Sequence, residues 1–322
     1  MALYAPAKRQ SKVPIPDTGQ RQEGVRPYLW TVREFARSRL LRFCFSEAED
    51  VRSQIAYVIA RVENRLEGIA KQGDTQDPAI TIEEKRVDNF YALVDVLDET
   101  GVLETWVHAA PGTHDAFRRR LYAAADRMGH LVRAEAEANK YGIDWQSHQV
   151  SVIDIHNLHS VAQMFVVGAL LKRLMEHKEL QGTAKPQVYV LLDELNKYAP
   201  REGWSPIKDV ILDIAERGRS LGVCLLGAQQ TASQVERRVL ANASIKVAGR
   251  LDAAEAERSE YGFLTKVARL RATLLQPGTM IVAQPDIPTP LLLRFPFPAW
   301  ATRLDEVPHG NSRQDPFSRF KK

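Results

Sequence analysis

The sequence has 322 residues, of which 44% are hydrophobic and 26% are charged, and its formal net charge is +4. This composition is typical of a soluble globular protein that can bury a full core in one large domain or two smaller ones. The weak positive charge permits a nucleic-acid partner without requiring one. The longest apolar run, residues 165–171, is too short to cross a bilayer, and the first residues lack the pattern of a signal peptide. We therefore expect a soluble, cytoplasmic protein with no membrane partner.

The cysteines and histidines do not have the spacing of a metal site. Cys44 and Cys224 both lie among apolar residues, which predicts two buried thiols rather than a disulfide or a metal pair. His156 and His159 follow a predicted strand, but no third ligand is near them in the sequence. The sequence therefore gives no basis for a zinc centre.

Four segments differ in their sequence pattern. Residues 1–28 are predicted to be a short extended piece followed by an irregular segment, and residues 29–145 a helical block without strands. Residues 146–300 alternate between strand and helix patterns. Residues 301–322 are predicted to be a surface-bound or frayed tail. We expect the third segment to carry the function.

The helical block contains three predicted helices. Two of them begin at the capping-box patterns Ser46-x-x-Glu49 and Thr81-x-x-Glu84. The third covers residues 116–140 and is rich in alanine, arginine and glutamate. Its arginines could form a basic face, although such a run is more often a solvated helix face. These arginines are Arg118, Arg119, Arg120, Arg127 and Arg133.

The alternating segment predicts βαβ units. Ser160-x-x-Gln163 has the pattern of a capping box before a helix over residues 161–176. Later helices are predicted over 206–219, 234–242, 253–261 and 265–275. Strands are predicted over residues 150–155, 188–192, 222–228, 245–249, 279–283 and 290–295. Strands separated by helices of this length indicate an α/β fold with a mostly parallel sheet and right-handed crossovers.

One predicted strand ends in two carboxylates. Residues 188–192 are an unbroken apolar run, followed directly by Asp193 and Glu194. A short apolar run of this kind predicts a central parallel strand buried on both faces. Sites in open α/β sheets lie beyond the carboxyl ends of such strands, where two acids could hold a hydrated Mg²⁺ and polarise a water. The alternative is a core strand whose acidic end simply faces solvent.

Polar residues also end two neighbouring strands. Gln229 and Gln230 follow the strand over residues 222–228, and Asp154 lies at the end of the strand over residues 150–155. At a common sheet edge, one carboxylate could serve a metal, another could orient water, and a side-chain amide could sense a transferred phosphate. A different reading is a metal-dependent hydrolase that uses Asp154 together with the two acids of the central strand.

Two stretches carry a family resemblance. Residues 188–200, VYVLLDELNKYAP, resemble the Walker B strand of the HerA/FtsK class of P-loop ATPases, and residues 215–230, AERGRSLGVCLLGAQQ, are similar to the helix and sensor strand that follow it. The similarity continues through residues 235–250 and 276–280 and covers roughly residues 147–300. It implies a RecA-like, three-layer α/β fold whose mostly parallel sheet is flanked by helices, with the helical block as an insertion.

The resemblance also implies roles for the polar strand ends. Asp193 would bind Mg²⁺ through water, Glu194 would activate the hydrolytic water, and Gln229 or Gln230 would sense the γ-phosphate of ATP. Members of the class are hexameric ring translocases or helicases that act on DNA. The resemblance leaves open a nuclease or another effector as a partner.

Basic residues receive roles from the same resemblance. In the class, an arginine from one subunit completes the neighbouring subunit's site, and its planar fork of donors suits phosphate oxygens. The candidates are Arg217, Arg219 and Arg250, and the alternative for each is a solvated or ion-paired arginine. Lys197 and Arg201 lie in a loop where a ring pore could meet the DNA backbone.

The phosphate-binding loop of this class is missing from the sequence. No Gly-x-x-x-x-Gly-Lys-Ser/Thr occurs in the 322 residues. Without it there is no cradle of backbone amides and no lysine for the phosphates. We therefore expect a chain truncated on its amino side, with a gap in the sheet and no measurable ATP hydrolysis of its own. The alternative is a non-hydrolysing scaffold, DNA-binding or ring-assembly subunit with the same fold.

Overall fold

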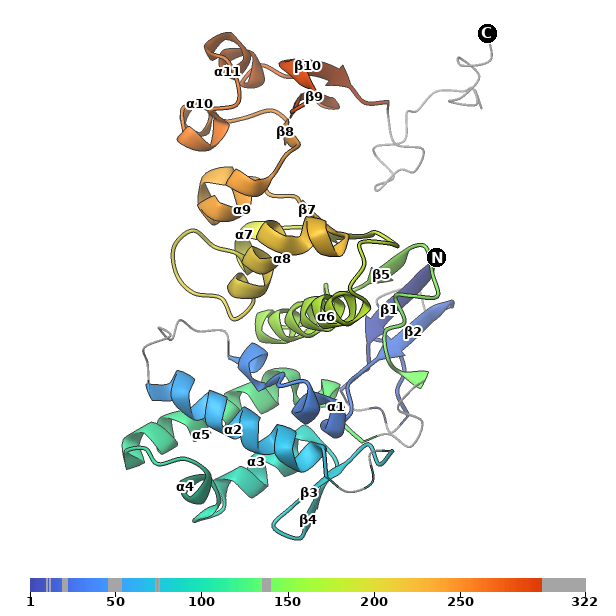
Figure 1. Ribbon diagram of the computed structural model, residues 1–322, viewed down its shortest axis with the longest axis vertical. Helices are drawn as coiled ribbons and strands as arrows, with labels where there is room; N and C mark the ends of the chain where they lie inside the picture. Colours follow the sequence, from blue (N-terminus) through green and yellow to red (C-terminus); the bar gives the residue numbers. More distant parts are fainter. Residues whose placement is uncertain are drawn as a thin grey trace. The chain divides into compact units, whose positions relative to one another are not determined.

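The computed structural model describes residues 1–9, 11, 13–18, 23–45, 54–72, 74, 76–134 and 140–296. The chain forms two compact units (Figure 1). The first comprises residues 1–230 and 234–239, and the second comprises residues 231–233 and the chain from 240 onward. The predicted Ser46-x-x-Glu49 capping box and the tail over residues 301–322 lie outside the described residues. Among the described residues, no helix is long and apolar enough to cross a membrane.

The first unit contains two parallel sheets. One has the order β2-β1-β5, formed by Val25–Tyr28, Ala2–Pro6 and Ser151–Ile153. The other pairs β6 (Val188–Leu192) with β7 (Val223–Gly227), in register from Val188 opposite Val223 to Leu192 opposite Gly227. The parallel α/β arrangement predicted from the alternating pattern is confirmed. The N-terminal segment is more regular than predicted, because β2 lies within the stretch expected to be irregular.

Two helices next to the β6–β7 pair form one helical layer. α6 (Ser160–Gln181) packs against α8 (Lys208–Leu221), and α8 packs against β7 (Figure 1). The α8 side chains Ile211 and Ile214 are buried, in agreement with the sequence pattern. The first half of α6 is apolar nearly all round, and Phe165 packs edge-on against Trp30 with ring centroids 4.9 Å apart. This packing joins the layer formed by α6 and α8 to the helical block.

The start of α6 differs from the prediction. His159, not Ser160, caps the helix, because its Nδ1 accepts a hydrogen bond from the N–H of Val161 at 3.2 Å. Gln163 turns back instead and donates to the carbonyls of Ile155 and Leu158 at 3.0 and 3.1 Å. The predicted capping box is therefore replaced by a histidine cap and a glutamine that ties down the preceding loop.

The helical block is built from α1 to α5 and contains one hairpin. The helices span Val32–Arg37, Gln54–Ala70, Phe90–Asp98, Val102–Trp106 and Pro111–Met128, with 3₁₀ turns at Leu41–Cys44 and Gly129–Leu131. α1 packs on α2, and α5 packs on α2 and α3. The third helix therefore begins earlier than predicted and ends at Met128, where a 3₁₀ turn takes over. Cys44 is buried here, as predicted, whereas Cys224 on β7 is only half-buried, and both cysteines are free.

The hairpin overturns the prediction that this block has no strands. β3 (Ile80–Ile82) and β4 (Lys85–Val87) pair antiparallel, with Thr81 opposite Arg86. Glu83 and Glu84 have φ of 48° and 64°, the left-handed pair that a tight hairpin turn requires. Thr81-x-x-Glu84 is therefore a strand and its turn rather than a capping box. α3 is capped instead by Asn89, whose Oδ1 accepts a hydrogen bond from the N–H of Ala92 at 2.9 Å.

The second unit is a small α/β unit with an antiparallel sheet. Its strands have the order β10-β9-β8, formed by Ile287–Arg294, Thr279–Gln284 and Lys246–Ala248. The short helices α10 (Ala253–Ala256) and α11 (Lys266–Ala272) pack with them around a core that includes Tyr261, Leu264 and Ile281. β9 and β10 are antiparallel, because a tight turn at residues 285–286 leaves no room for a crossover helix. β8 and β9 are also antiparallel, although α10 and α11 lie between them, so the predicted parallel βαβ unit is wrong in this part of the chain.

Candidate functional site

The acidic pair lies in a tight turn at the carboxyl end of β6. Asp193 and Glu194 are both exposed, and the Asp193 carboxylate accepts the N–H of Glu194 at 3.0 Å. Glu194 has φ 52° and ψ 50°, a left-handed conformation that is uncommon for a residue with a side chain. The short helix α7 (Leu195–Tyr198) starts directly after it. Left-handed non-glycine residues are concentrated at functional sites, which makes Glu194 the most informative position of this turn.

The end of β7 lies directly beside this turn. The N–H of Ala228 donates to the carbonyl of Leu192 at 2.9 Å, and the N–H of Leu195 donates to the carbonyl of Ala228 at 3.0 Å. A Cβ atom on Gly227 would lie 2.4 Å from Cδ2 of Leu195, so this close packing needs glycine. Gln229 and Gln230 therefore follow β7 at the same edge as the two acids, as the sequence predicts.

The two glutamines differ in their surroundings. Gln230 is exposed, whereas Gln229 is half-buried. The Oε1 atom of Gln229 is buried and has no hydrogen-bond partner among the residues that the structure describes. A buried amide oxygen without a partner is costly, so this group is a natural contact for a donor brought by a ligand or another chain.

Tyr198 lies beside the two acids of the candidate site, and the sequence pattern did not indicate it. Burial raises its pKa to about 12, and the negative charges of Glu194 and Asp193 add to the shift. Its side chain is 4% exposed. The phenol is therefore kept neutral next to the acidic pair. Its position four residues after Glu194 is the only sequence signal that could have indicated it.

The loop after α7 is attached to the segment that follows β7. Pro200 bridges to Val235, and the N–H of Arg201 donates to the carbonyl of Gln234 at 2.8 Å. Lys208 and Glu236 form an ion pair at 2.7 Å between largely buried side chains. These contacts hold α7, and with it the acidic turn, in one position.

The two residues predicted to meet DNA are engaged within the chain. Lys197 donates through its ammonium to the side-chain oxygen of Gln163 on α6. Arg201 is half-buried, and its backbone is paired as described above. Their predicted role in DNA binding remains a prediction.

Arg217 and Arg219 lie at the opposite edge of the β6–β7 pair from the acids. Both are in the last turns of α8, just before β7 begins, and a Cβ on Gly218 between them would lie 2.6 Å from the carbonyl oxygen of Val223. Arg217 pairs with Asp213 and, at 2.8 Å, with Glu179, and these partners raise its pKa. Within one chain, neither arginine can reach Asp193 or Glu194, so a role at a nucleotide would have to be in a neighbouring copy.

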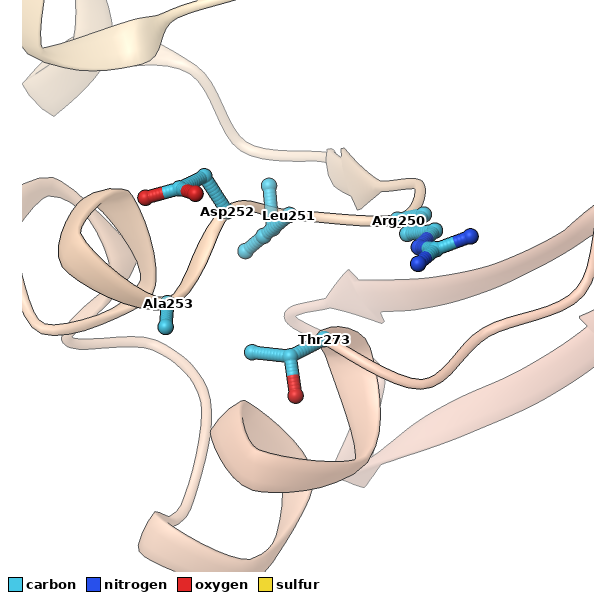
Figure 2. A pocket seen from close by; sticks show the side chains of 5 residues that line it. All are labelled: Arg250, Leu251, Asp252, Ala253 and Thr273. Carbon is cyan, nitrogen blue, oxygen red and sulfur yellow. The ribbon is translucent and has the colours of Figure 1, made fainter.

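Arg250 belongs to the second unit. It lines a shallow pocket together with Leu251, Asp252, Ala253 and Thr273. Figure 2 shows that the side chains of Arg250 and Asp252 point away from each other. The guanidinium is exposed and is therefore sterically available to a partner.

The structure does not gather a multi-acid metal centre. Among the residues that it describes, no group of three or more histidine, cysteine, aspartate or glutamate side chains could hold a metal ion. Asp154 lies at the end of β5, in the other parallel sheet, where its Oδ1 accepts the N–H of His156 at 2.9 Å. The metal-dependent hydrolase built on three acids therefore receives no support, whereas a magnesium ion held through water needs only one carboxylate.

The predicted basic helix face is interrupted by ion pairs. The Arg118 side chain is only 16% exposed and pairs with Glu104 at 2.8 Å and with Asp98 at 3.3 Å. Arg133 lies beyond the end of α5 and donates to the carbonyl of Ser11 at 2.8 Å. These two arginines therefore do not belong to one open basic surface.

Comparisons with known proteins give similarity in structure but not in sequence. No protein-family model and no curated protein matches the sequence. The bacterial conjugative coupling protein TrwB, in a trigonal form with sulphate, is similar with a TM-score of 0.60 at 11% identity, over 94% of this chain and 80% of that chain. TrwB in complex with ADP and Mg²⁺ is similar with a TM-score of 0.59 at 10% identity, also over 94% of this chain and 80% of that chain. The genome-packaging NTPase B204 of Sulfolobus turreted icosahedral virus 2, with ATP-gammaS, has a TM-score of only 0.35 over 46% of this chain and 68% of that one.

The fold follows from the coupling-protein similarity. The chain has an α/β fold like that of TrwB, with parallel strands flanked by helices. This confirms the predicted fold class. An identity near 10% shows the fold alone, so the activity must be argued from the residues of the site.

Proposed function

We propose that this chain is part of an ATP-dependent DNA translocase or helicase of the HerA/FtsK class. The observation that carries the proposal is the pairing of Asp193–Glu194 with Gln229 at the carboxyl ends of two hydrogen-bonded parallel strands. Phosphoryl transfer needs a group for the metal, a group that orients water and a group that senses the phosphate, and these residue types supply all three. The left-handed backbone at Glu194 supports a functional rather than a purely structural role for this turn.

Each site residue has a chemical task in this proposal. Asp193 is a carboxylate of the kind that Mg²⁺ prefers, acting through coordinated water. Glu194 accepts a proton from the attacking water, and Gln229 or Gln230 contacts the γ-phosphate. The Mg²⁺, when bound with ATP, neutralises charge that develops on the phosphates. The chain itself offers no cradle for those phosphates, because the glycine-rich loop is absent from its sequence. Its contribution is therefore half of a catalytic site.

The similar structures support this proposal. TrwB is a coupling protein whose structures include complexes with ADP and Mg²⁺ and with a non-hydrolysable ATP analogue. Binding of ATP and Mg²⁺ by an assembly that contains this chain, action on DNA, and a hexameric ring are proposals of ours by analogy of fold. Arg217, Arg219 or Arg250 would complete the site of a neighbouring subunit, and a nuclease or another effector remains a proposed partner.

The test uses the chain purified from its native source together with the proteins that accompany it. ATP hydrolysis is measured with and without double-stranded DNA. Glu194→Gln should lower turnover by about 10²–10⁴-fold, since it removes the general base, while nucleotide binding is retained. Glu202→Gln, the same change at an exposed glutamate of the following loop, is the matched control and should leave turnover unchanged. Equal turnover in both variants would refute the assignment.

The second candidate is a scaffold or DNA-binding subunit that does not hydrolyse ATP. The observation in its favour is the missing phosphate-binding loop. A native assembly that contains this chain, binds DNA and shows no Glu194-dependent ATP turnover would establish it over the ATPase.

A further inference from the structure

We propose that Lys197 and Gln163 are positioning residues for the acidic turn, because their side chains join it to the loop that follows β5. In this role neither residue touches nucleotide or metal, and Lys197 acts inside the chain rather than on the DNA backbone. Their effect on catalysis rests on the proposed function, whereas the connection between the two loops rests on hydrogen bonds and burial alone.

The two parallel sheets of the first unit are not joined by a backbone ladder. Among the described residues, β5 pairs with β1 in one sheet, and β6 pairs with β7 in the other. Asp154 follows β5, and the acidic turn at residues 193–194 follows β6. Backbone pairing therefore places each loop within its own sheet. The position of one loop against the other must come from side chains and helices.

Gln163, in the first turn of α6, uses both ends of its amide. Its Nε2 donates to the carbonyls of Ile155 and Leu158 at 3.0 and 3.1 Å, so it holds the loop after β5. Its Oε1 accepts a hydrogen bond from the ammonium of Lys197 on α7. A side-chain amide donates and accepts at the same time, whereas an ionised carboxylate only accepts. Glutamine therefore suits a bridge between two carbonyls and an ammonium.

Lys197 is attached to the acidic turn through α7. Its backbone N–H donates to the carbonyl of Glu194 at 2.8 Å. Lys197 and Gln163 are both half-buried, and a hydrogen bond from an ammonium is stronger than one between neutral groups. Loss of the Gln163 oxygen would leave a half-buried positive charge without this acceptor, which is unfavourable. The contact therefore constrains α7.

The backbone anchors of α7 lie on the side of β7. The N–H of Leu195 donates to the carbonyl of Ala228 at 3.0 Å, and the N–H of Glu236 donates to the carbonyl of Ala199 at 2.9 Å. Both of these partners follow β7 in the chain. The bond from Lys197 instead leads to α6 and the loop after β5. A helix as short as α7 is not stable by itself, so its orientation follows from anchors on both sides.

Loss of the bridge should lower catalysis while the fold remains. A displacement of about 1 Å near a reacting group can cost about 10²-fold in rate. Under the proposed function, Lys197→Met should therefore lower kcat for ATP in the native assembly by about 10- to 100-fold. KM for ATP should stay within about twofold, because the bridge does not contact nucleotide. Lys197→Arg keeps a charged donor for Gln163 and should restore most of kcat.

Amide hydrogen exchange on the purified chain tests the connection without ATP hydrolysis. Lys197→Met and Gln163→Leu should each raise exchange at residues 155–159 and at residues 195–198 together. The expected rise is about tenfold, the factor that corresponds to one charge-assisted hydrogen bond. Amides of β7 and α8 should keep the wild-type rates, which shows that the fold is intact. Gln181→Leu, at the exposed end of α6, is the matched control and should change neither segment.

Three results would overturn the positioning role. The first is a rise in exchange confined to the substituted element in both Lys197→Met and Gln163→Leu, because the two loops would then not be joined. The second is wild-type kcat for folded Lys197→Met in an assembly whose turnover depends on Glu194. The third is weaker DNA binding by Lys197→Met with unchanged exchange, which would return this lysine to the DNA backbone.

The exchange measurement separates the bridge from the proposed function. If both segments exchange faster in the variants and turnover in the native assembly does not depend on Glu194, the bridge stands and the ATPase assignment falls. If turnover depends on Glu194 and only the substituted element exchanges faster, the ATPase assignment stands and the bridge falls.

Discussion

The backbone N–H of Leu195 donates to the carbonyl of Ala228 at 3.0 Å, and this bond holds the acidic turn against the end of the neighbouring strand. Glu194 precedes the donor and Gln229 follows the acceptor. Glu194 and Gln229 are therefore the sequence neighbours of the two residues that this hydrogen bond joins. Their mutual position is set by backbone pairing rather than by their own side chains, so both can be substituted without loss of the arrangement.

Replacement of Gly227 by alanine should destabilise the chain. The added Cβ would lie 2.4 Å from Cδ2 of Leu195, and the packing must shift to accept it. We expect the free energy of unfolding to fall by about 1–3 kcal/mol, measured by urea denaturation. Gly68→Ala in α2 is the control, because nothing lies within 4 Å of its new Cβ. Gly68→Ala should be as stable as the wild type or more stable by up to about 1 kcal/mol. Equal urea midpoints for Gly227→Ala and Gly68→Ala would argue against the tight contact at Gly227.

Backbone strain at Glu194 predicts an unusual order of stability. Glycine adopts left-handed conformations without a steric cost, whereas alanine does not. The free energy of unfolding of Glu194→Gly should therefore exceed that of Glu194→Ala by about 1 kcal/mol. Asn64, an exposed residue inside α2, is the control position. Asn64→Gly should be less stable than Asn64→Ala by about 1 kcal/mol, because glycine is unfavourable inside a helix. The same order at both positions would mean that Glu194 is not held in the left-handed region.

The raised pKa of Tyr198 predicts a loss of stability at high pH. The folded chain holds the Tyr198 proton up to a pKa of about 12, against an ordinary value of 10.0. The folded state therefore binds more protons than the unfolded state between these values, and stability falls as the pH rises through them. Tyr198→Phe should remove this contribution, so its unfolding midpoint should fall less steeply across this window. Parallel pH profiles for the two proteins would contradict the shift.

The sequence could predict that the candidate residues lie at one sheet edge, because the segments that bring them together are short and consecutive. A short apolar run, two acids, a crossover helix and a second run ending in glutamines specify parallel strands whose ends meet at one edge. The helix α8 and the strands β6 and β7 were all predicted within a few residues of their bounds. Tyr198 was not predicted, because its importance comes from burial beside the acids, which spacing does not reveal.

The predictions were wrong where packing against other parts of the chain determines the local structure or the burial. Thr81-x-x-Glu84 has the sequence pattern of a capping box, but Glu83 and Glu84 adopt left-handed backbone conformations and form the turn of a hairpin. An unbroken apolar run predicts burial on both faces, yet Tyr189 and Leu191 are exposed, because no element of the described chain covers that side. The second error shows that an apolar pattern alone does not distinguish a strand covered on one face from one covered on both.

Steady-state ATP hydrolysis by purified residues 1–322 tests the central claim most directly. The claim is that this chain carries only the acid and amide half of an ATPase site. The wild-type chain and Glu194→Gln should show the same background rate with Mg²⁺, with or without DNA, because the phosphates have no cradle. Robust turnover by the wild-type chain that Glu194→Gln abolishes would contradict the account.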